Sequence, residues 1–140
     1  MEMIQDQINR DIPGIFQKYK KIAVVGASDK PHRDSYQVAR VMKQAGYRIF
    51  PVNPNVSEIL GVECYSTLLE IPENVELVDI FRRPEHVEPI VEHAIQIGAK
   101  AVWMQLGVAN EAAAKKALDA GLEVIMNRCW KIEYYNYGPF

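Results

Sequence analysis

Cysteine is scarce in this 140-residue chain, and neither sign of charge dominates it. The two cysteines, Cys64 and Cys129, are far apart and form no CxxC pair, so they predict neither a disulfide framework nor a zinc site. The chain has 16 Lys and Arg against 18 Asp and Glu, a formal net charge of −2. Nucleic-acid-binding domains usually carry a basic excess, so this balance argues against a nucleic-acid partner.

Long apolar runs are missing as well. No stretch of about 18 apolar residues could form a transmembrane helix. The N-terminus, Met-Glu-Met-Ile-Gln-Asp, is acidic and polar where a secretory signal would be basic and then apolar. Free thiols suit a reducing compartment. We therefore expect a cytoplasmic protein that has no membrane partner.

What the chain does have is a regular alternation of two kinds of segment. Hydrophobic residues make up 49% of it, enough for the core of one domain. Short apolar runs such as Lys21–Val25 predict buried strands, and apolar residues between them recur at helical spacing, as at Val38, Val41 and Met42. We expect strands at 21–25, 47–52, 77–81, 101–106 and 122–126, and helices at about 35–45, 84–97 and 110–120. The segment 56–72 is expected to be a loop with a short helix near residues 67–69.

This order of elements is typical of the α/β class. It predicts a Rossmann-type three-layer domain with a five-stranded parallel sheet and helices on both faces. The near-continuous apolar strands agree, because both faces of such a sheet are covered. We assign residues 21–140 to this domain.

Residues 1–20 are predicted to be a helical N-terminal extension. A break at Pro13-Gly14 interrupts its apolar stripe, which consists of Ile4, Ile8, Ile12, Ile15, Phe16 and Tyr19. Packing of this stripe on the domain is the first interpretation, and a homodimer interface is the second.

In open parallel sheets, ligands bind beyond the carboxyl ends of the strands. In this chain that rim comprises residues 26–33, 53–55, 81–84, 105–108 and 127–131. Gly26 permits a tight turn and a close backbone approach to a ligand. Residues 34–37 have the spacing of a capping box, which places a helix start at about residue 35. Free N–H groups at that start favour a phosphate, and Lys30 and Arg33 lie just before it.

More cations follow two other strands, namely Arg82 and Arg83 after 77–81 and Arg128 after 122–126. A local basic excess in a slightly acidic chain fits a small, highly charged anion. The loop at 26–31 is neither GxGxxG nor a P-loop. At residues 53–55 no acid is available for the ribose hydroxyls of a dinucleotide, which weakens the case for NAD and leaves NADP open. The residues therefore predict a small anionic nucleotide as ligand.

Five motifs follow one another along the chain: Gly26-x-Ser28-x-x-Pro31-x-Arg33-x-Ser35, Pro51-Val52-Asn53-Pro54, Asp79-Ile80-Phe81-Arg82-Arg83, Gln105-Leu106-Gly107 and Asn127-Arg128-Cys129. With these motifs the chain closely resembles, from about Lys21 to Glu133, the small stand-alone CoA-binding-domain proteins. These are relatives of the CoA-binding domain at the N-terminus of the succinyl-CoA synthetase alpha subunit. The resemblance implies a Rossmann-type fold that holds coenzyme A along the rim.

The resemblance also implies a role for each part of the rim. The first loop would meet the phosphates, and the turn at 53–55 would lie near the adenosine. Residues 81–83 would contact adenine or pantetheine, and Cys129 would flank the far end of the ligand. The predicted cofactor-binding residues are Gly26, Ala27, Ser28, Asp29, Lys30, Arg33, Ser35, Asn53, Pro54, Asn55, Phe81, Arg82, Arg83, Gly107, Arg128 and Cys129. The related synthetase has a basic residue directly after Asn-Pro, where this chain has Asn55, which puts the contact with the ribose 3′-phosphate in question.

No Ser/His/Asp set, carboxylate pair or metal-ligand cluster stands at a recognisable spacing. The related synthetase uses a phosphorylated histidine of a later domain, and His32, His86 and His93 are no candidates for that role. We predict no catalytic and no metal-binding residues, and hence a protein that binds CoA or an acyl-CoA and is not an enzyme.

Two alternatives stay open. One is a small NADP-dependent oxidoreductase with Cys129 or a tyrosine as proton donor. The other is an interaction protein with a vestigial nucleotide site, docking through the N-terminal stripe and an aromatic tail that consists of Tyr134, Tyr135, Tyr137 and Phe140. Cys129 itself is interpreted either as an ordinary thiol or as a reactive one beside Arg128.

Overall fold

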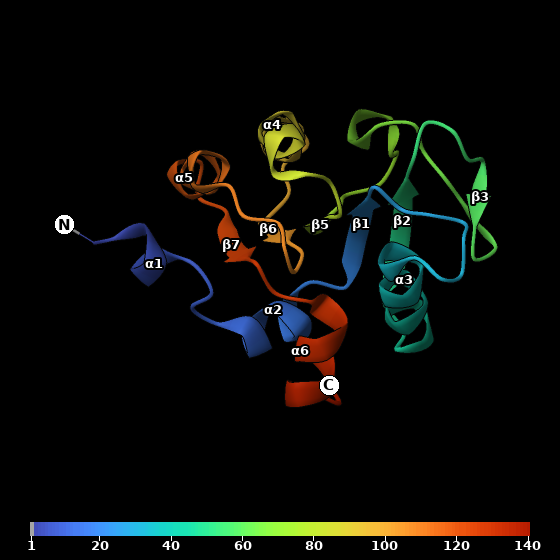
Figure 1. The fold of residues 1–140 in the computed structure, drawn as a ribbon, viewed down its shortest axis with the longest axis horizontal. Coiled ribbons are helices and arrows are strands. Elements are labelled where there is room, and N and C mark those ends of the chain that lie inside the picture. Colours follow the sequence, from blue (N-terminus) through green and yellow to red (C-terminus); the bar gives the residue numbers. More distant parts are fainter. Residues whose placement is uncertain (1) are drawn as a thin grey trace.

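A single parallel sheet organises the molecule, which we describe over residues 2–140 of a computed structural model. The sheet has five strands in the order β2-β1-β5-β6-β7, and all neighbours are parallel (Figure 1). The strands are β1 (Lys21–Val25), β2 (Arg48–Val52), β5 (Leu77–Ile80), β6 (Ala101–Met104) and β7 (Glu123–Met126). This architecture confirms the predicted α/β class with its five-stranded parallel sheet.

Helices cover both faces of this sheet. One face carries α4 (Val87–Gln96) and α5 (Glu111–Asp119), and the other carries α2 (Ile12–Lys18), α3 (Asp34–Gln44) and α6 (Trp130–Tyr137) (Figure 1). The strands alternate their side chains between these two layers, so each face has its own core. Together with the sheet, the two helical layers form the three-layer arrangement that the sequence predicted.

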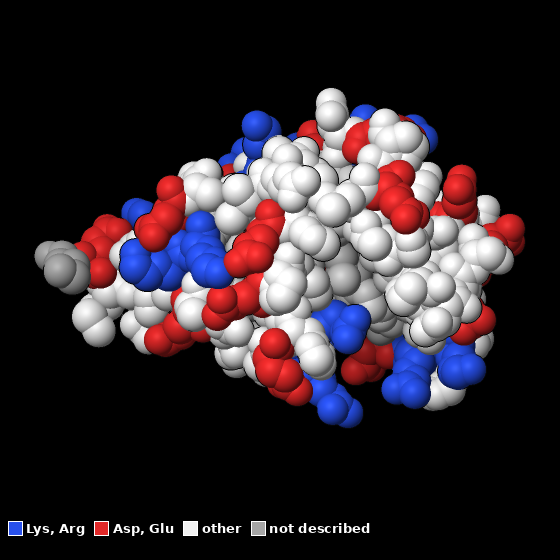
Figure 2. Space-filling view, turned by 90° about the horizontal axis from the view of Figure 1, so that it is seen from above, with Lys and Arg blue, Asp and Glu red and all other residues white. Residues whose placement is uncertain are grey.

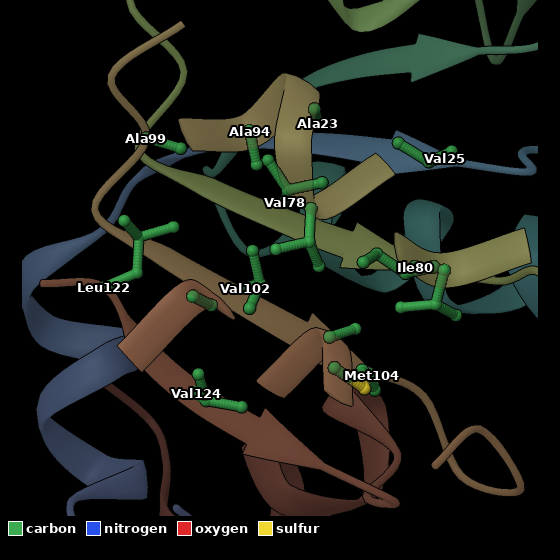
Figure 3. Packing of buried hydrophobic residues seen from close by; sticks show 14 of the residues in the cluster. Ala23, Val25, Val78, Ile80, Ala94, Ala99, Val102, Met104, Leu122 and Val124 are labelled. Carbon is green, nitrogen blue, oxygen red and sulfur yellow. The ribbon is translucent and has the colours of Figure 1, made fainter. Parts of the chain in front are cut away.

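The two cores differ in composition. The core under α4 and α5 is mostly aliphatic, with Val78, Val102 and Met104 of the sheet packed against alanines of the helices (Figure 3). The opposite core is aromatic, and its largest fully buried side chains are Trp103, Trp130 and Phe16. Full burial of such rings contributes roughly 1.5–3 kcal/mol each, so this cluster fixes α2 and α6 firmly on the sheet.

The N-terminal residues pass around the β7 edge and contribute to both cores. Ile8, which follows α1 (Ile4–Gln7), packs into the aliphatic core, and Ile15 of α2 packs into the aromatic core. Between them lies Asn9, whose Oδ1 accepts a hydrogen bond from Met126 N at 2.7 Å and whose Nδ2 donates to Met126 O at 3.3 Å. The backbone N–H of Asn9 donates to Val124 O at 2.9 Å. These bonds cover an edge strand whose backbone would otherwise be open to pairing.

Several local predictions need correction. The capping box at residues 34–37 is wrong: α3 begins at Asp34 with Arg33 as N-cap residue, and the Gln37 side chain donates to Pro31 O instead of to the cap. Pro84 opens a 3-10 helix, η2 (Pro84–His86), and α4 begins only at Val87. The predicted strand ends at residues 81, 105 and 106 lie in the rim loops.

Two elements were not predicted. Residues 56–66, expected as loop, contain the hairpin β3 (Glu58–Ile59) and β4 (Val62–Glu63), which precedes the 3-10 helix η1 (Leu68–Glu70). These strands have two residues each, too few to give an alternating pattern. Helix α6 was treated as an aromatic tail, because its apolar residues form no single stripe and only Trp130 is buried.

Candidate functional site

The rim of the sheet contains a crevice where the direction of the connections changes. The chain leaves β1 for α3 on the aromatic face, and it leaves the neighbouring strand β5 for α4 on the aliphatic face. Loops that diverge from adjacent strands leave a gap between them, the usual ligand position in such sheets. Figure 2 shows the molecule from above the view of Figure 1, on the side where α4 and α5 lie. Mostly uncharged surface occupies the centre of that view, with Lys and Arg at its border among some acidic side chains.

Three cavities lie along this crevice. The first, which we call the β1-loop cavity, has a volume of about 360 Å³ and lies where β1 passes into α3. Its lining includes the backbone of the first loop and the side chains of Lys30, Arg33 and Ser35. Asp34 lines the cavity as its single acid, so the two cations, with the unpartnered first N–H groups of α3, leave the cavity positive on balance.

Gly26 gives the first loop its shape. Its φ is +85°, and a Cβ at this position would lie 2.4 Å from the carbonyl oxygen of Phe81 on the neighbouring strand exit. A side chain would therefore push the ends of β1 and β5 apart. The side-chain amide of Asn53 donates a hydrogen bond to Ala27 O at 2.8 Å, which connects the turn after β2 to the first loop.

The second cavity, the α4 cavity, has a volume of about 550 Å³ and lies between the β2 turn and α4. Asn53, Pro54 and Asn55 line one side, and Arg82 and His93 line the other. The turn is internally fixed, because Asn53 Oδ1 accepts a hydrogen bond from Asn55 N at 2.8 Å. Ser66 and Thr67, ahead of η1, complete the wall with hydroxyl groups.

The third cavity, the α6 cavity, has a volume of about 530 Å³ and lies between the starts of α3 and α6. Its walls are mixed: Phe81, Leu106 and Ile132 are apolar, and Cys129 and Gln105 are polar or polarisable. All three cavities share Phe81, and the α4 and α6 cavities also share Arg82. They therefore form one continuous path around the strand exit of β5.

Buried polar side chains are concentrated at this path. Between residues 2 and 140, the polar residues counted as buried are Ser35, Asp79 and Gln105, with 6%, 0% and 5% exposure. Ser35 lines the β1-loop cavity and Gln105 the α6 cavity, whereas Asp79 lies two residues before Phe81. Buried polar groups normally have hydrogen-bond partners, so side chains that keep free polar atoms here point to a ligand.

Asp79 is the most deeply buried ionisable group. Neither carboxyl oxygen has a hydrogen-bond partner in the described part of the chain, and Asp79 pairs in register with Val24 and Trp103 of the two adjacent strands. Burial raises the pKa of this carboxyl well above its ordinary value. Burial therefore favours the neutral form of the Asp79 side chain.

The structure brings most of the predicted site residues together. The β1-loop cavity contains Gly26, Ala27, Ser28, Lys30, Arg33 and Ser35; the α4 cavity contains Asn53, Pro54 and Asn55; and the α6 cavity contains Arg83, Gly107 and Cys129. Phe81 and Arg82 lie between cavities. Asp29 and Arg128 line none of the three, and the Arg128 guanidinium instead bonds Asn127 O at 2.9 Å.

Sequence reasoning missed several lining residues. Ser66 and Thr67 lie in the segment whose hairpin was not predicted, and no motif marked them. His93 was interpreted as a surface residue of a helix, but it is half-buried and faces the α4 cavity. Gln105 and Lys131 lay within the predicted rim but were not among the predicted binding residues, and Ile132 directly follows that rim.

Neither a metal centre nor a membrane span is found in residues 2–140. No group of three or more His, Cys, Asp or Glu side chains is placed to hold a metal ion. No helix in this range is long and apolar enough to cross a membrane.

Fold and crevice together define a Rossmann-like α/β domain with a ligand-binding rim. Residues 20–135 match the family described as CoA binding domain, and the chain belongs to that family. This confirms the resemblance that the five motifs indicated.

The relatives include proteins of similar length and parts of larger enzymes. The uncharacterized protein YneT of Bacillus subtilis is 40% identical over 131 residues, which are 94% of this chain and 97% of YneT. A hypothetical protein from Pyrococcus horikoshii OT3, whose structure is solved, is 43% identical with a TM-score of 0.90, covering 98% of this chain and 96% of that one. The acetate–CoA ligase [ADP-forming] II of Archaeoglobus fulgidus is 34% identical over 95 residues, which are 66% of this chain but only 14% of the ligase.

Proposed function

We propose that the protein binds coenzyme A or an acyl-CoA along the three rim cavities, and that it does so without catalysing a reaction. The observation that carries this proposal is the linear arrangement of the cavities around Phe81, with the positive β1-loop cavity adjoining both others. CoA has the matching layout: a nucleotide at one end, a diphosphate in the middle and a mostly apolar pantetheine arm at the other.

The diphosphate is assigned to the β1-loop cavity. Phosphate oxygens accept hydrogen bonds, and this cavity offers free N–H groups, the Ser35 hydroxyl and the cations Lys30 and Arg33. Ser35 is 94% buried, from an exposure of 6%, and lines this cavity, where its hydroxyl can donate a hydrogen bond to an anion.

The adenosine is assigned to the α4 cavity. No carboxylate lines it, so it has no group of the kind that holds the ribose hydroxyls of NAD. The missing basic residue at Asn55 is compensated by Arg82 and His93, which line the same cavity and can face a ribose 3′-phosphate. The chain's family and the ligase relative named above support CoA over NADP as the occupant.

The proposal of a non-catalytic role rests on the side chains along the path. Amides, hydroxyls and cations dominate it, groups that bind and orient an anion. The described residues of the three cavities contain no nucleophile in hydrogen-bond contact with a histidine or carboxylate base.

Thermal denaturation of the purified protein with CoA, dephospho-CoA, NADP, NAD or ATP tests this function. CoA should raise the Tm most, because a ligand that binds only the folded state stabilises it. Arg33→Ala should weaken CoA binding by about 10- to 100-fold through loss of a charge-assisted hydrogen bond. Lys115→Ala removes an exposed cation outside the three cavities and is the matched control. A Tm raised by NADP but not by millimolar CoA would overturn the proposal.

A further inference from the structure

Cys129 occupies a fixed position at the end of the rim path. On one side, the indole N–H of Trp103 donates to Arg128 O at 2.8 Å. On the other, Trp130 N donates to Gln105 Oε1 at 3.1 Å, and the fully buried Trp130 ring packs against Phe16. The residues on either side of Cys129 are therefore bonded to side chains from β6 and its exit, so its backbone is held in place.

The thiol itself is open to the α6 cavity. Cys129 is half-buried, is unpaired, and lies against the aromatic core with its side chain lining the cavity. Leu106 and Ile132 line the same cavity and are 61% and 48% exposed. A thiol between uncovered apolar side chains is accessible to a ligand that covers them.

An independent feature also points to a ligand at this place. Gln105 is 95% buried, from an exposure of 5%, and lines the cavity. Its Oε1 is used by Trp130 N, whereas its Nε2 donates to no atom of residues 2–140. The Nε2 donor of this cavity-lining side chain is therefore available to a carbonyl oxygen supplied from outside. The pantetheine arm of CoA carries two amide carbonyls and ends in a thiol.

We propose that Cys129 is a site of covalent modification, at which its sulfur exchanges with a disulfide of coenzyme A to form a protein–CoA mixed disulfide. This inference rests on the proposed function, because it needs the pantetheine arm in the α6 cavity with Gln105 Nε2 bonded to it. The chain would then act as a carrier or sensor of oxidised CoA.

The exchange needs no oxidant besides the disulfide. Cys129 loses its proton to solvent, and its thiolate attacks the CoA-bearing sulfur of a disulfide. A new S–S bond forms to CoA, the old S–S bond breaks, and the departing thiolate takes a proton from solvent. One disulfide is consumed and one is formed, and a second thiol, such as free CoA, reverses the step.

The charges in the cavity favour this reaction. Arg82, Arg83 and Lys131 line it, against the single acid Asp34. Three cations against one acid attract an anionic disulfide into this cavity.

The other cysteine is a natural control. Cys64 lines none of the three cavities, and its sulfur lies 3.6 Å from Asn53 O. Burial raises the pKa of the Cys64 thiol, which disfavours its thiolate.

Intact-mass spectrometry without reductant, after incubation with CoA disulfide, tests the proposal. We expect one added CoA per chain, removed by a thiol reductant and mapped to Cys129 in the unaltered protein by peptide analysis. Cys64→Ser should still form the adduct and Cys129→Ser should not. An adduct on Cys64, or none at all, would overturn the inference.

The rate of adduct formation distinguishes a thiol beside a binding site for CoA from a thiol that is merely exposed. Glutathione disulfide is anionic but has no nucleotide, so it should react about 100-fold more slowly than CoA disulfide, which is held beside the sulfur. Gln105→Glu keeps the acceptor for Trp130 N and removes the Nε2 donor, and we expect it to weaken CoA binding about tenfold. Equal rates for the two disulfides would contradict the inference.

Failure of this inference can be distinguished from failure of the proposed function. If reduced CoA raises the Tm but Cys129 shows no preference for CoA disulfide, only the covalent step is wrong. If reduced CoA neither raises the Tm nor competes with adduct formation, the proposed function is wrong as well.

Discussion

At the scale of single residues, the crevice depends on a close approach that only glycine permits. Gly26→Ala would place a Cβ 2.4 Å from Phe81 O. We expect it to lower the free energy of unfolding by about 2–4 kcal/mol and to abolish the CoA-induced rise in Tm, since both backbone strain and a steric clash result. Urea denaturation and thermal shift measure these effects.

Gly121→Ala is the control for that variant. Gly121 has a similar φ of +87°, but a Cβ there would have no neighbour within 4 Å. It should lose only about 1–2 kcal/mol from backbone strain and keep ligand binding. If both variants lost the same stability and both still bound CoA, the role given to the contact at Phe81 would be wrong.

Asp79 gives the protein a specific pH dependence. Its pKa is raised in the folded state, so above about pH 4 the unfolded chain loses a proton that the folded chain keeps. Stability is therefore lost as the pH rises from about 4 toward the folded pKa. Asp79→Asn removes this loss, and the variant should gain about 1.4 kcal/mol over the natural protein for each pH unit in that window. Urea denaturation from pH 4 to 8 measures the difference, and a difference independent of pH would contradict the explanation.

At this scale the sequence predicted the loop residues better than the buried ones. Gly26, Arg33 and Asn53 were predicted because strand exits are recognisable from apolar runs. Whether a side chain then faces a cavity depends on χ angles and neighbours, which is why Arg128 turns to its own backbone. The sequence also could not predict that only the oxygen of the Gln105 side chain is hydrogen-bonded, because that bond depends on the position of α6.

At the scale of elements, the N-terminal segment protects the sheet. Asn9→Ala would remove two side-chain hydrogen bonds to Met126 at the β7 edge and leave a non-glycine residue at a φ of 56° without the usual support of an asparagine side chain. We expect a loss of about 1–3 kcal/mol in the free energy of unfolding, measured in urea. Gln5→Ala removes an exposed hydrogen bond to Glu111 and should change stability by less than about 0.5 kcal/mol. Equal losses in the two variants would refute this role of Asn9.

The predictions of helices were confirmed where the hydrophobic periodicity was strong. They were wrong or missing where tertiary contacts decide the structure. Helices α3, α4 and α5 carry one buried stripe each, so their existence was predictable and only their ends were wrong. Helix α6 is held instead by tertiary contacts of Trp130 and Tyr134 with Phe16 of α2. No local pattern encodes such contacts.

At the scale of the whole molecule, the ligand path spans both layers of helices. The α4 cavity lies toward the aliphatic face, and the α6 cavity lies between helices of the aromatic face. A ligand that fills only one of them should bind weakly. We expect CoA to bind at least about 100-fold more tightly than either adenosine 3′,5′-bisphosphate or pantetheine, because linkage makes the second contact intramolecular. Calorimetric titration of the three compounds measures this, and a bisphosphate that binds as tightly as CoA would leave the α6 cavity without a role.

The alternation of strands and helices predicted the class and the parallel sheet. It did not give the order β2-β1-β5-β6-β7, which depends on which crossovers pack on which face. The position of the crevice beside β1 followed from the general rule for such sheets, but its division into three cavities depends on η1, the β3–β4 hairpin and α6.

Gln105 has a consequence for attempts to redesign this protein. Its oxygen fixes the start of α6 and its nitrogen faces the cavity, so one side chain serves both folding and recognition. In a library that randomises this position, variants that lose expression could not be told apart from variants that change ligand specificity. Leu106 and Ile132 border the same space, are largely exposed, and make no side-chain hydrogen bonds, so they are the positions at which new cargo preferences can be selected independently of folding.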